Sequence, residues 1–215
     1  MTEVEDGSTW VAVADFLVTV LAVFVMIYAG SQQKDPELLK KVRDISTALE
    51  LDKGSGFIRE FEADDRQVRI VYSDQDLGFR PCGWTVEAPA ADRIRNHMER
   101  FAGVVDYINL LQIEGHADVR RSSTCEQLKF RTNFELSQTR AMSVFAALLG
   151  RPIDKLDEVV SGLAAPAPTR VVEVLAASQR ILVAGFGATK PVPNTPPDDV
   201  RQRRVELRIT FRDRR

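Results

Sequence analysis

The sequence predicts one N-terminal membrane-spanning α-helix followed by a small α+β domain, in which helices pack on one face of a mixed sheet. Two patterns lead to this fold class. Residues 10–30 form an almost unbroken apolar run, and from residue 57 onward helical and strand-like periodicities alternate. The length of 215 residues leaves room for one ordinary domain and a short attachment. With 44% hydrophobic and 28% charged residues, the chain has the composition of a folded protein.

Composition and charge also exclude several classes of function. The net charge of −2 and the pI of about 5.8 argue against a general nucleic-acid binder, which carries a basic excess. His97 and His116, far apart in the sequence, are too few for a His/Cys metal site. Neither histidine has a fixed Ser or Cys partner nearby that would form a nucleophile–base pair. We therefore expect a protein that is not an enzyme and that has no metal, cofactor or nucleic-acid partner.

The apolar run over residues 10–30 reads WVAVADFLVTVLAVFVMIYAG. As an α-helix it spans roughly 31 Å, which matches the hydrocarbon core of a bilayer. Trp10 and Tyr28 lie near its ends, where aromatic rings favour the membrane interface. A signal peptide would need a basic start and a shorter apolar stretch, whereas this N-terminus is acidic. A buried soluble helix is rarely apolar on every face, so we predict a transmembrane helix.

Asp15 is the one charged residue in this run. A carboxylate on a spanning helix costs a few kcal/mol, so it normally faces a pore or a partner rather than lipid. Thr19 follows one turn later on the same face, where it could bond the carboxylate or an ion. The alternative is that Asp15 only marks where the span begins. If Asp15 binds a transported proton or sodium ion, a polytopic partner must supply the other walls of the pathway.

These patterns divide the chain into four parts. We expect a short cytoplasmic N-terminus at 1–9, the transmembrane helix at 10–30, a linker with a short helix at 31–56, and a folded domain at 57–215.

The linker helix, over residues 35–51, should begin with Asp35 as its N-cap and Pro36 as its first residue. Apolar residues then recur every three or four positions, at Leu38, Val42, Ile45 and Leu49. This short seam fits a parallel dimer stalk, a regulatory plug or a helix that docks on the following domain.

Within the domain, the periodicity predicts strands at 68–71, 110–114, 181–183 and 205–211, and helices at 91–108, 137–149 and 171–179. The second of these helices should be capped by Ser137 or Asn133.

Four motifs in this region resemble the OmpA-like peptidoglycan-binding domain. They are IEGHAD at 113–118, NFELSQTRA at 133–141, GFG at 185–187 and RRVE at 203–206, and they occur in the order of the family's own motifs. The resemblance covers roughly residues 57–215 and implies a domain that binds the peptide of the bacterial cell wall.

The resemblance also implies roles for single residues. Asp118 matches the family aspartate that binds the ammonium group of diaminopimelate, and Arg140 matches the arginine that binds its carboxylate. Asn133 and Leu136 match positions that shape the same pocket, and Arg203 or Arg204 would add positive charge at its rim. Without the motifs, Asp118 could equally be a helix-capping carboxylate and Arg140 a surface residue.

Departures from the family pattern concern the ligand more than the fold. Ala117 replaces a threonine, Gln202 replaces an asparagine, and the loop between Asp118 and Asn133 is longer than is usual. Cys82 and Cys125 both fall in loops that we expect on the ligand side of the sheet. They could form a disulfide in an oxidising periplasm or remain as two buried thiols.

The N-terminal residues Trp10, Ala14, Asp15, Phe16 and Thr19 are similar to the membrane helix of MotB-type stator subunits. This resemblance implies a B subunit of an ion-driven rotary motor, present as a homodimer inside five copies of a polytopic MotA-like or ZorA-like A subunit and anchored to peptidoglycan. The short chain and its acidic N-terminus favour a non-flagellar member such as the ZorB subunit of Zorya anti-phage systems. The alternatives are a flagellar MotB subunit and a passive membrane-to-wall tether.

The predicted topology conflicts with one rule. Basic residues follow the span and none precedes it, which by the positive-inside rule would leave the domain in the cytoplasm. A wall-binding domain must instead be outside, and large domains can translocate largely regardless of charge. We therefore expect a single-pass protein of the bacterial inner membrane with its C-terminal domain in the periplasm.

Overall fold

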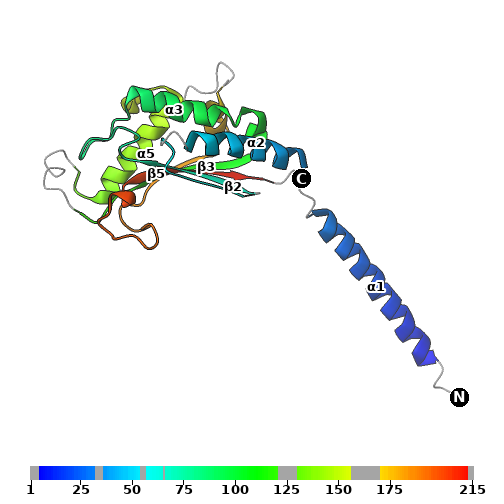
Figure 1. The fold of residues 1–215 in the computed structure, drawn as a ribbon. Helices are drawn as coiled ribbons and strands as arrows, with labels where there is room; N and C mark the ends of the chain where they lie inside the picture. The colour runs from blue at the N-terminus through cyan, green and yellow to red at the C-terminus, as the bar shows by residue number, and fades with distance from the viewer. Residues whose placement is uncertain are drawn as a thin grey trace. The chain divides into compact units, whose positions relative to one another are not determined.

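The computed structural model describes residues 5–31, 36–53, 57–64, 66–120, 130–155 and 170–212. The chain forms two compact units, Met1–Pro36 and Glu37–Arg215. The first contains helix α1 (Glu5–Ser31), and the second contains a five-stranded sheet with its helices (Figure 1). The predicted fold class, an apolar N-terminal helix and a mixed sheet covered by helices, is confirmed.

Helix α1 is long and apolar enough to cross a membrane. Its window Trp10–Tyr28 contains 19 residues with a mean hydropathy of 2.5, and no part of that window is buried. Among the described residues, no other helix combines this length with this hydropathy.

The sheet consists of β1 (Glu60–Ala63), β2 (Gln67–Ser73), β3 (Ile108–His116), β4 (Ile181–Gly185) and β5 (Arg204–Phe211), in the order β1-β2-β5-β3-β4. Strands β3 and β4 are parallel, and every other neighbouring pair is antiparallel. The last strand of the chain therefore lies at the centre of the sheet, between β2 and β3. All four predicted strands are present, and β1 adds a fifth that is too short to show a period in the sequence.

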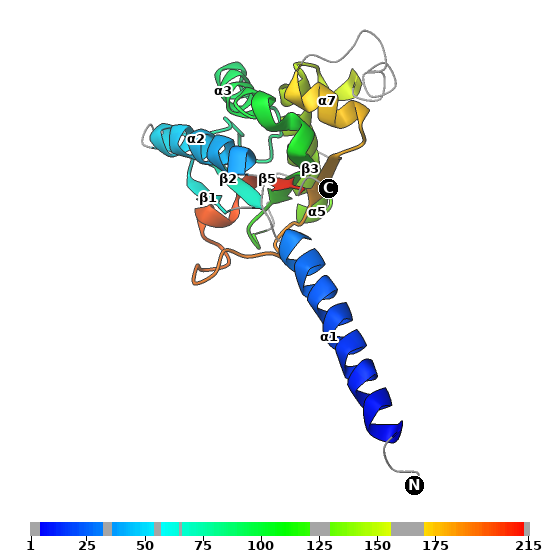
Figure 2. The same cartoon turned by 90° about the vertical axis from the view of Figure 1, so that its right-hand side faces the viewer.

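Helices cover one face of this sheet. They are α2 (Pro36–Lys53), α3 (Ala88–Glu99), α5 (Asn133–Leu149) and α7 (Val171–Ala177). Helices α2 and α3 lie above the strands in Figure 1, and α7 lies on the same side as α3 in Figure 2. Alternate residues of the central strands, such as Ile70, Ile113 and Leu207, are fully buried in the core between sheet and helices. The helix predicted at 91–108 is two elements, because α3 ends at Glu99 and a 3₁₀ helix follows at Ala102–Tyr107.

Helix α2 packs against the domain. Its apolar residues Leu38, Val42 and Leu49 are buried in the same core. At its C-terminal end, the Asp52 carboxylate lies 3.2 Å from Nε2 of His97 and 2.6 Å from Nη2 of Arg100. Of the three roles that the sequence leaves open for this helix, the structure shows docking on the domain. The predicted N-cap Asp35 lies outside the described residues.

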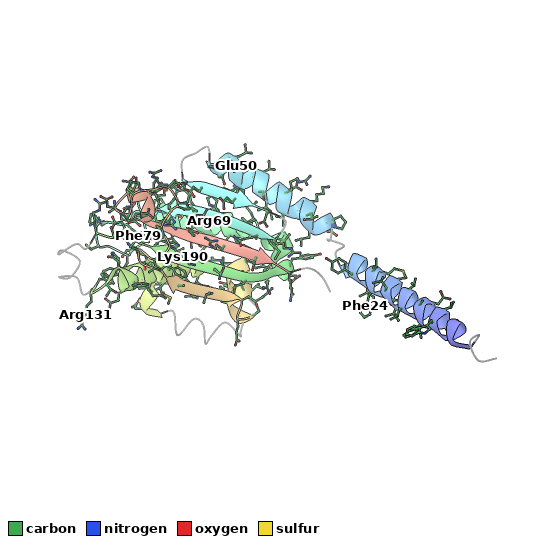
Figure 3. All side chains as sticks on the ribbon, turned by 90° about the horizontal axis from the view of Figure 1, so that it is seen from below. Phe24, Glu50, Arg69, Phe79, Arg131 and Lys190 are labelled. Carbon is green, nitrogen blue, oxygen red and sulfur yellow. The ribbon has the colours of Figure 1, made fainter. Side chains whose placement is uncertain are left out.

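The opposite face of the sheet carries charged side chains, and Arg69 and Lys190 are labelled on it in Figure 3. Glu206 on β5 is fully buried there and accepts hydrogen bonds from Arg69, Arg204 and Arg208. Two 3₁₀ turns complete the described elements of the domain, at Ile153–Lys155 and Val200–Gln202.

Candidate ligand-binding site

The site forms where the N-terminus of α5 meets the sheet, and local sequence fixes where α5 begins. Thr132 is the N-cap: its hydroxyl accepts a hydrogen bond from the backbone NH of Glu135, and the Glu135 carboxylate accepts one from the NH of Thr132. This reciprocal pair is a capping box. The predicted caps, Ser137 and Asn133, are therefore wrong, because both lie inside the helix and their side chains bond elsewhere.

Those two side chains attach α5 to neighbouring loops. The Asn133 amide donates to the backbone carbonyl of Asp118 at 2.7 Å, just beyond the end of β3. The Ser137 hydroxyl accepts a hydrogen bond from the backbone NH of Gly187 at 2.9 Å, just beyond the end of β4. Each bond joins two of the predicted motifs.

Two strand glycines let α5 lie directly on the sheet. A Cβ on Gly115 would overlap the backbone carbonyl of Ser137, and one on Gly185 would overlap the backbone of Gln138. Because no side chain separates the strands from the helix, residues of the first two helical turns are brought to the ends of β3 and β4. Three motifs far apart in the sequence thus meet at one corner of the domain.

Asp118, Arg140 and Arg203 lie at this corner, together with Asp74. Asp118 and Arg140 are only 6% and 3% exposed. Nε of Arg203 is 3.8 Å from Oδ2 of Asp118, and Nη1 of Arg140 is 2.8 Å from Oδ2 of Asp74. Nε of Arg140 also donates to the backbone carbonyl of Gly83 at 2.9 Å. The structure therefore brings the predicted acidic and basic residues together and gives Arg140 a carboxylate partner of its own.

Burial sets the electrostatics of the Asp74–Arg140 pair. It raises the pKa of Asp74, against the opposing effects of Arg140 and Arg203. It also lowers the pKa of Arg140, against the opposing attraction of Asp74. Both directions reflect the cost of holding a charge away from water, and the pair offsets part of that cost.

Two polar atoms at this corner are left without a partner in the described part of the chain. Oδ1 of Asp74 and Nε of Arg203 are buried and form no hydrogen bond with the described residues. In contrast, Nε and Nη1 of Arg140 donate to Gly83 and Asp74. Buried atoms of this kind normally have a partner, so the corner presents an open acceptor and an open donor side by side.

Arg120 pairs with the Asp118 carboxylate at this corner. Its Nε lies 3.1 Å from Oδ2 of Asp118, while its own side chain is 57% exposed. Because most of the Arg120 side chain is in water, it can leave Asp118 without burying an unpaired guanidinium.

Sequence reasoning missed Asp74 and Arg120. The strand directions explain the position of Asp74: β2 and β3 are both antiparallel to β5 and therefore run in the same direction. Asp74 follows β2 directly, and Asp118 follows β3 by two residues, so both carboxylates lie at the same edge of the sheet. Only the strand order, which the sequence does not show, makes this evident.

The remaining predicted site residues lie partly at the corner and partly elsewhere in the domain. Leu136 is buried at the start of α5, whereas Arg204 faces away from the site and bonds Glu206 at 2.6 Å on the other sheet face. Of the two rim candidates, Arg203 is thus the one at the site. Gln202 is buried and bonds Val192, Thr195 and Pro196, which fixes the proline-rich loop rather than a ligand.

The cysteine pairing stays a prediction. Cys82 is buried, and none of the described residues is a free cysteine. Its expected partner Cys125 lies outside the described residues.

Asp15 lies on α1, in the other unit. The predicted bond from Thr19 to its carboxylate is not formed: the Thr19 hydroxyl donates to the backbone carbonyl of Asp15 at 2.8 Å, as helical threonines commonly do. The Asp15 side chain is exposed, and its role as an ion-binding residue stays a prediction.

One buried cluster has the donor atoms of a metal site. Ligand atoms of Glu114, His116 and Glu206 lie within 4.8 Å of one another. Both oxygens of Glu206 already accept bonds from arginines, and Lys190 lies 3.4 Å from Glu114. A divalent cation would have to displace these positive groups, so the cluster is better explained as a charge-paired network.

Comparison with known proteins establishes the fold. No family model matches the sequence, and no curated protein matches it. Among solved structures, the chain is similar to a MotB-like protein from Desulfovibrio vulgaris, with a TM-score of 0.56, 22% identity, and coverage of 82% of this chain and 95% of that one. It is also similar to the cell wall anchor of the type VI secretion system from Pseudomonas aeruginosa, with a TM-score of 0.52, 21% identity, and coverage of 78% and 97%. The domain therefore has the fold shared by these two proteins, as the motif resemblance implied.

Proposed function

We propose that this chain is the wall-anchored B subunit of an ion-driven rotary motor in the bacterial inner membrane. Asp15 on α1 binds the transported proton or sodium ion, and the C-terminal domain holds the subunit still by binding peptidoglycan in the periplasm. The observation that carries the proposal is the combination, on one chain, of an apolar window with a single carboxylate in it and a wall-anchor fold whose motif residues meet at one corner.

The proposed ligand is the diaminopimelate residue of the wall peptide. Its ammonium group binds the Asp118 carboxylate in place of Arg120, and the open Oδ1 of Asp74 offers a second acceptor. Its carboxylate binds the guanidinium of Arg140 and the open Nε of Arg203. A negative and a positive group held side by side select a zwitterionic ligand end over a simple anion or cation.

The proposed assembly contains two copies of this chain within a ring of five polytopic A subunits of the MotA or ZorA kind. A change of charge on Asp15 drives the stepping of that ring. The short chain and acidic N-terminus favour anti-phage defence of the Zorya type over a flagellar role.

A second function, a passive membrane-to-wall tether, is favoured by the similarity to the cell wall anchor of a secretion system. In a tether, Asp15 would be incidental.

The substitution Asp15→Asn separates the motor from the tether. We expect it to abolish the cellular output, scored as phage protection or motility, while membrane insertion and co-sedimentation with purified peptidoglycan stay unchanged. Leu17→Asn, which adds the same amide to an exposed apolar position about 200° around α1 from Asp15, serves as the matched control and should retain output. Full output in Asp15→Asn would establish the tether.

A second experiment tests the wall-binding half. Single cysteines introduced into the domain should react with a membrane-impermeant reagent in intact spheroplasts. A domain that is labelled only after lysis is cytoplasmic, and that result would remove peptidoglycan binding from the proposal.

A further inference from the structure

A hollow lies between α3, α5 and the segment that joins β2 to α3, near the corner site. Its volume is about 440 Å³, within the range of small-molecule sites. Most of its lining is apolar: Trp84 and Val86 come from the joining segment, Ala91 from α3, Ala147 from α5, and Ile153 from the turn after α5.

Residues of the wall of this hollow adjoin residues of the corner site, both in the sequence and along α5. Gly83, whose carbonyl binds Arg140, is followed directly by Trp84 in the wall of the hollow. On α5, Ser143 and Ala147 lie three and seven positions after Arg140 and therefore on the same face. At the helical rise these positions are about 4.5 and 10.5 Å beyond Arg140, which is one to three residues of extended peptide.

The polar groups of the hollow suit a short peptide with free carboxylates. The Ser143 hydroxyl forms no hydrogen bond with the described residues. Arg95 and Arg151 both line the hollow, and Asp154 is the one acidic residue among its lining. Arg95 is paired with Asp92, whereas Arg151 is exposed and forms no ion pair with the described residues.

We propose that this hollow is a subsite for the part of the wall peptide that adjoins diaminopimelate. The methyl group of the D-alanine that follows diaminopimelate packs against Val86, Ala147 and Ile153, its backbone bonds the Ser143 hydroxyl, and its terminal carboxylate pairs with Arg151. The inference rests on the proposed function, because the corner site must hold diaminopimelate for the adjoining residues to reach the hollow.

Calorimetry on the purified full chain in detergent, with two ligands, tests the subsite. Free meso-diaminopimelate reports on the corner alone, and the tetrapeptide L-Ala–γ-D-Glu–meso-diaminopimelate–D-Ala reports on both sites. We expect the unsubstituted chain to bind the tetrapeptide at least tenfold more tightly. Ala147→Leu, which fills the hollow with a good helix former, should remove most of this advantage and leave diaminopimelate binding within twofold.

Arg151→Ala provides a second variant at an exposed position that does not threaten folding, and it should weaken tetrapeptide binding about threefold. Ala177→Leu and Arg43→Ala are the matched controls, at exposed helical positions outside the hollow, and should change neither ligand.

The failures of the two proposals differ. If the unsubstituted chain binds both ligands equally, or if Ala147→Leu and Arg151→Ala leave the ratio unchanged, the subsite is overturned while the corner site stands. If neither ligand binds the unsubstituted chain, the proposed wall-binding function is overturned, and the subsite with it.

Discussion

Arg140 has two roles: the motifs predict that it binds a ligand carboxylate, and in the structure it forms an ion pair with Asp74. It also donates a hydrogen bond to the carbonyl of Gly83. A guanidinium that is 3% exposed needs these contacts, because an unpaired buried charge costs several kcal/mol. Loss of wall binding on removal of Arg140 would therefore combine a lost ligand contact with a destabilised fold.

Asp74→Ala should reveal the structural half of this role. It leaves Arg140 buried without a counter-ion, so the free energy of unfolding, measured by urea denaturation, should fall by about 3 kcal/mol. The double variant Asp74→Ala/Arg140→Leu removes the stranded charge and should regain part of that loss. Equal stability of Asp74→Ala and the unsubstituted chain would show that the pair contributes nothing to the fold.

At the scale of elements, α2 is the helix whose partner the sequence leaves most open. Its seam of apolar residues has the spacing of a coiled coil, and that spacing alone cannot distinguish a partner helix from the domain core. In the structure the seam is buried in the core, and Asp52 adds an ion pair with α3 at its end. The domain therefore includes this helix as a packed part.

Two leucines of α2 test this packing. Leu49 is 0% exposed and Leu51 is 76% exposed, although they lie two positions apart on one helix. Leu49→Ala should lower the free energy of unfolding by about 2–5 kcal/mol, because it opens a cavity in the core. Leu51→Ala, the matched control, should change it by less than about 0.5 kcal/mol. Equal small effects would instead favour a free stalk or plug.

At the scale of the domain, the sheet has one apolar and one charged face. The charged face holds Glu206 fully buried among Arg69, Arg204 and Arg208. Burial opposes the charge of Glu206, but the hydrogen bonds and attraction of Arg69 and Arg204 outweigh it and hold its pKa well below the usual range of a glutamate. Burial also lowers the pKa values of His97 and His116.

These shifts predict a domain that loses stability in acid. The unfolded chain protonates its histidines at about pH 6.5 and its glutamates at about 4.3, in each case before the folded chain does. The stabilisation from these groups is thus fully present above about pH 6.5, declines below it, and falls more steeply below about pH 4.3, by at most about 1.4 kcal/mol per pH unit for a carboxylate such as Glu206. Asp74, whose pKa is raised, acts in the opposite direction and offsets part of this loss.

Urea denaturation of the full chain from pH 7.5 to 3.5 measures this profile. Glu206→Gln should be less stable at neutral pH and should lose part of the steep segment below pH 4.3. A free energy of unfolding that stays constant over this range would contradict the assignment of Glu206 as a charged, paired group.

The sequence by itself determined the features that depend on local pattern. Hydropathy alone defines α1 as an apolar helix of membrane-spanning length, and the period of apolar residues located four of the five strands. The motif order located Asp118, Asn133 and Arg140, because the turns and helix starts that hold them are coded by adjacent residues.

Only the tertiary structure decided which distant groups meet. The place of β5 between β2 and β3 makes β2 and β3 run in the same direction and brings Asp74 to the edge where Asp118 lies. The same packing gave Arg140 its counter-ion, turned Arg204 away from the site, and buried the seam of α2. The pairing of Arg140 and the burial of α2 depend on contacts between residues tens of positions apart, and the free energy of such contacts is set by strand order and burial, which no local pattern contains.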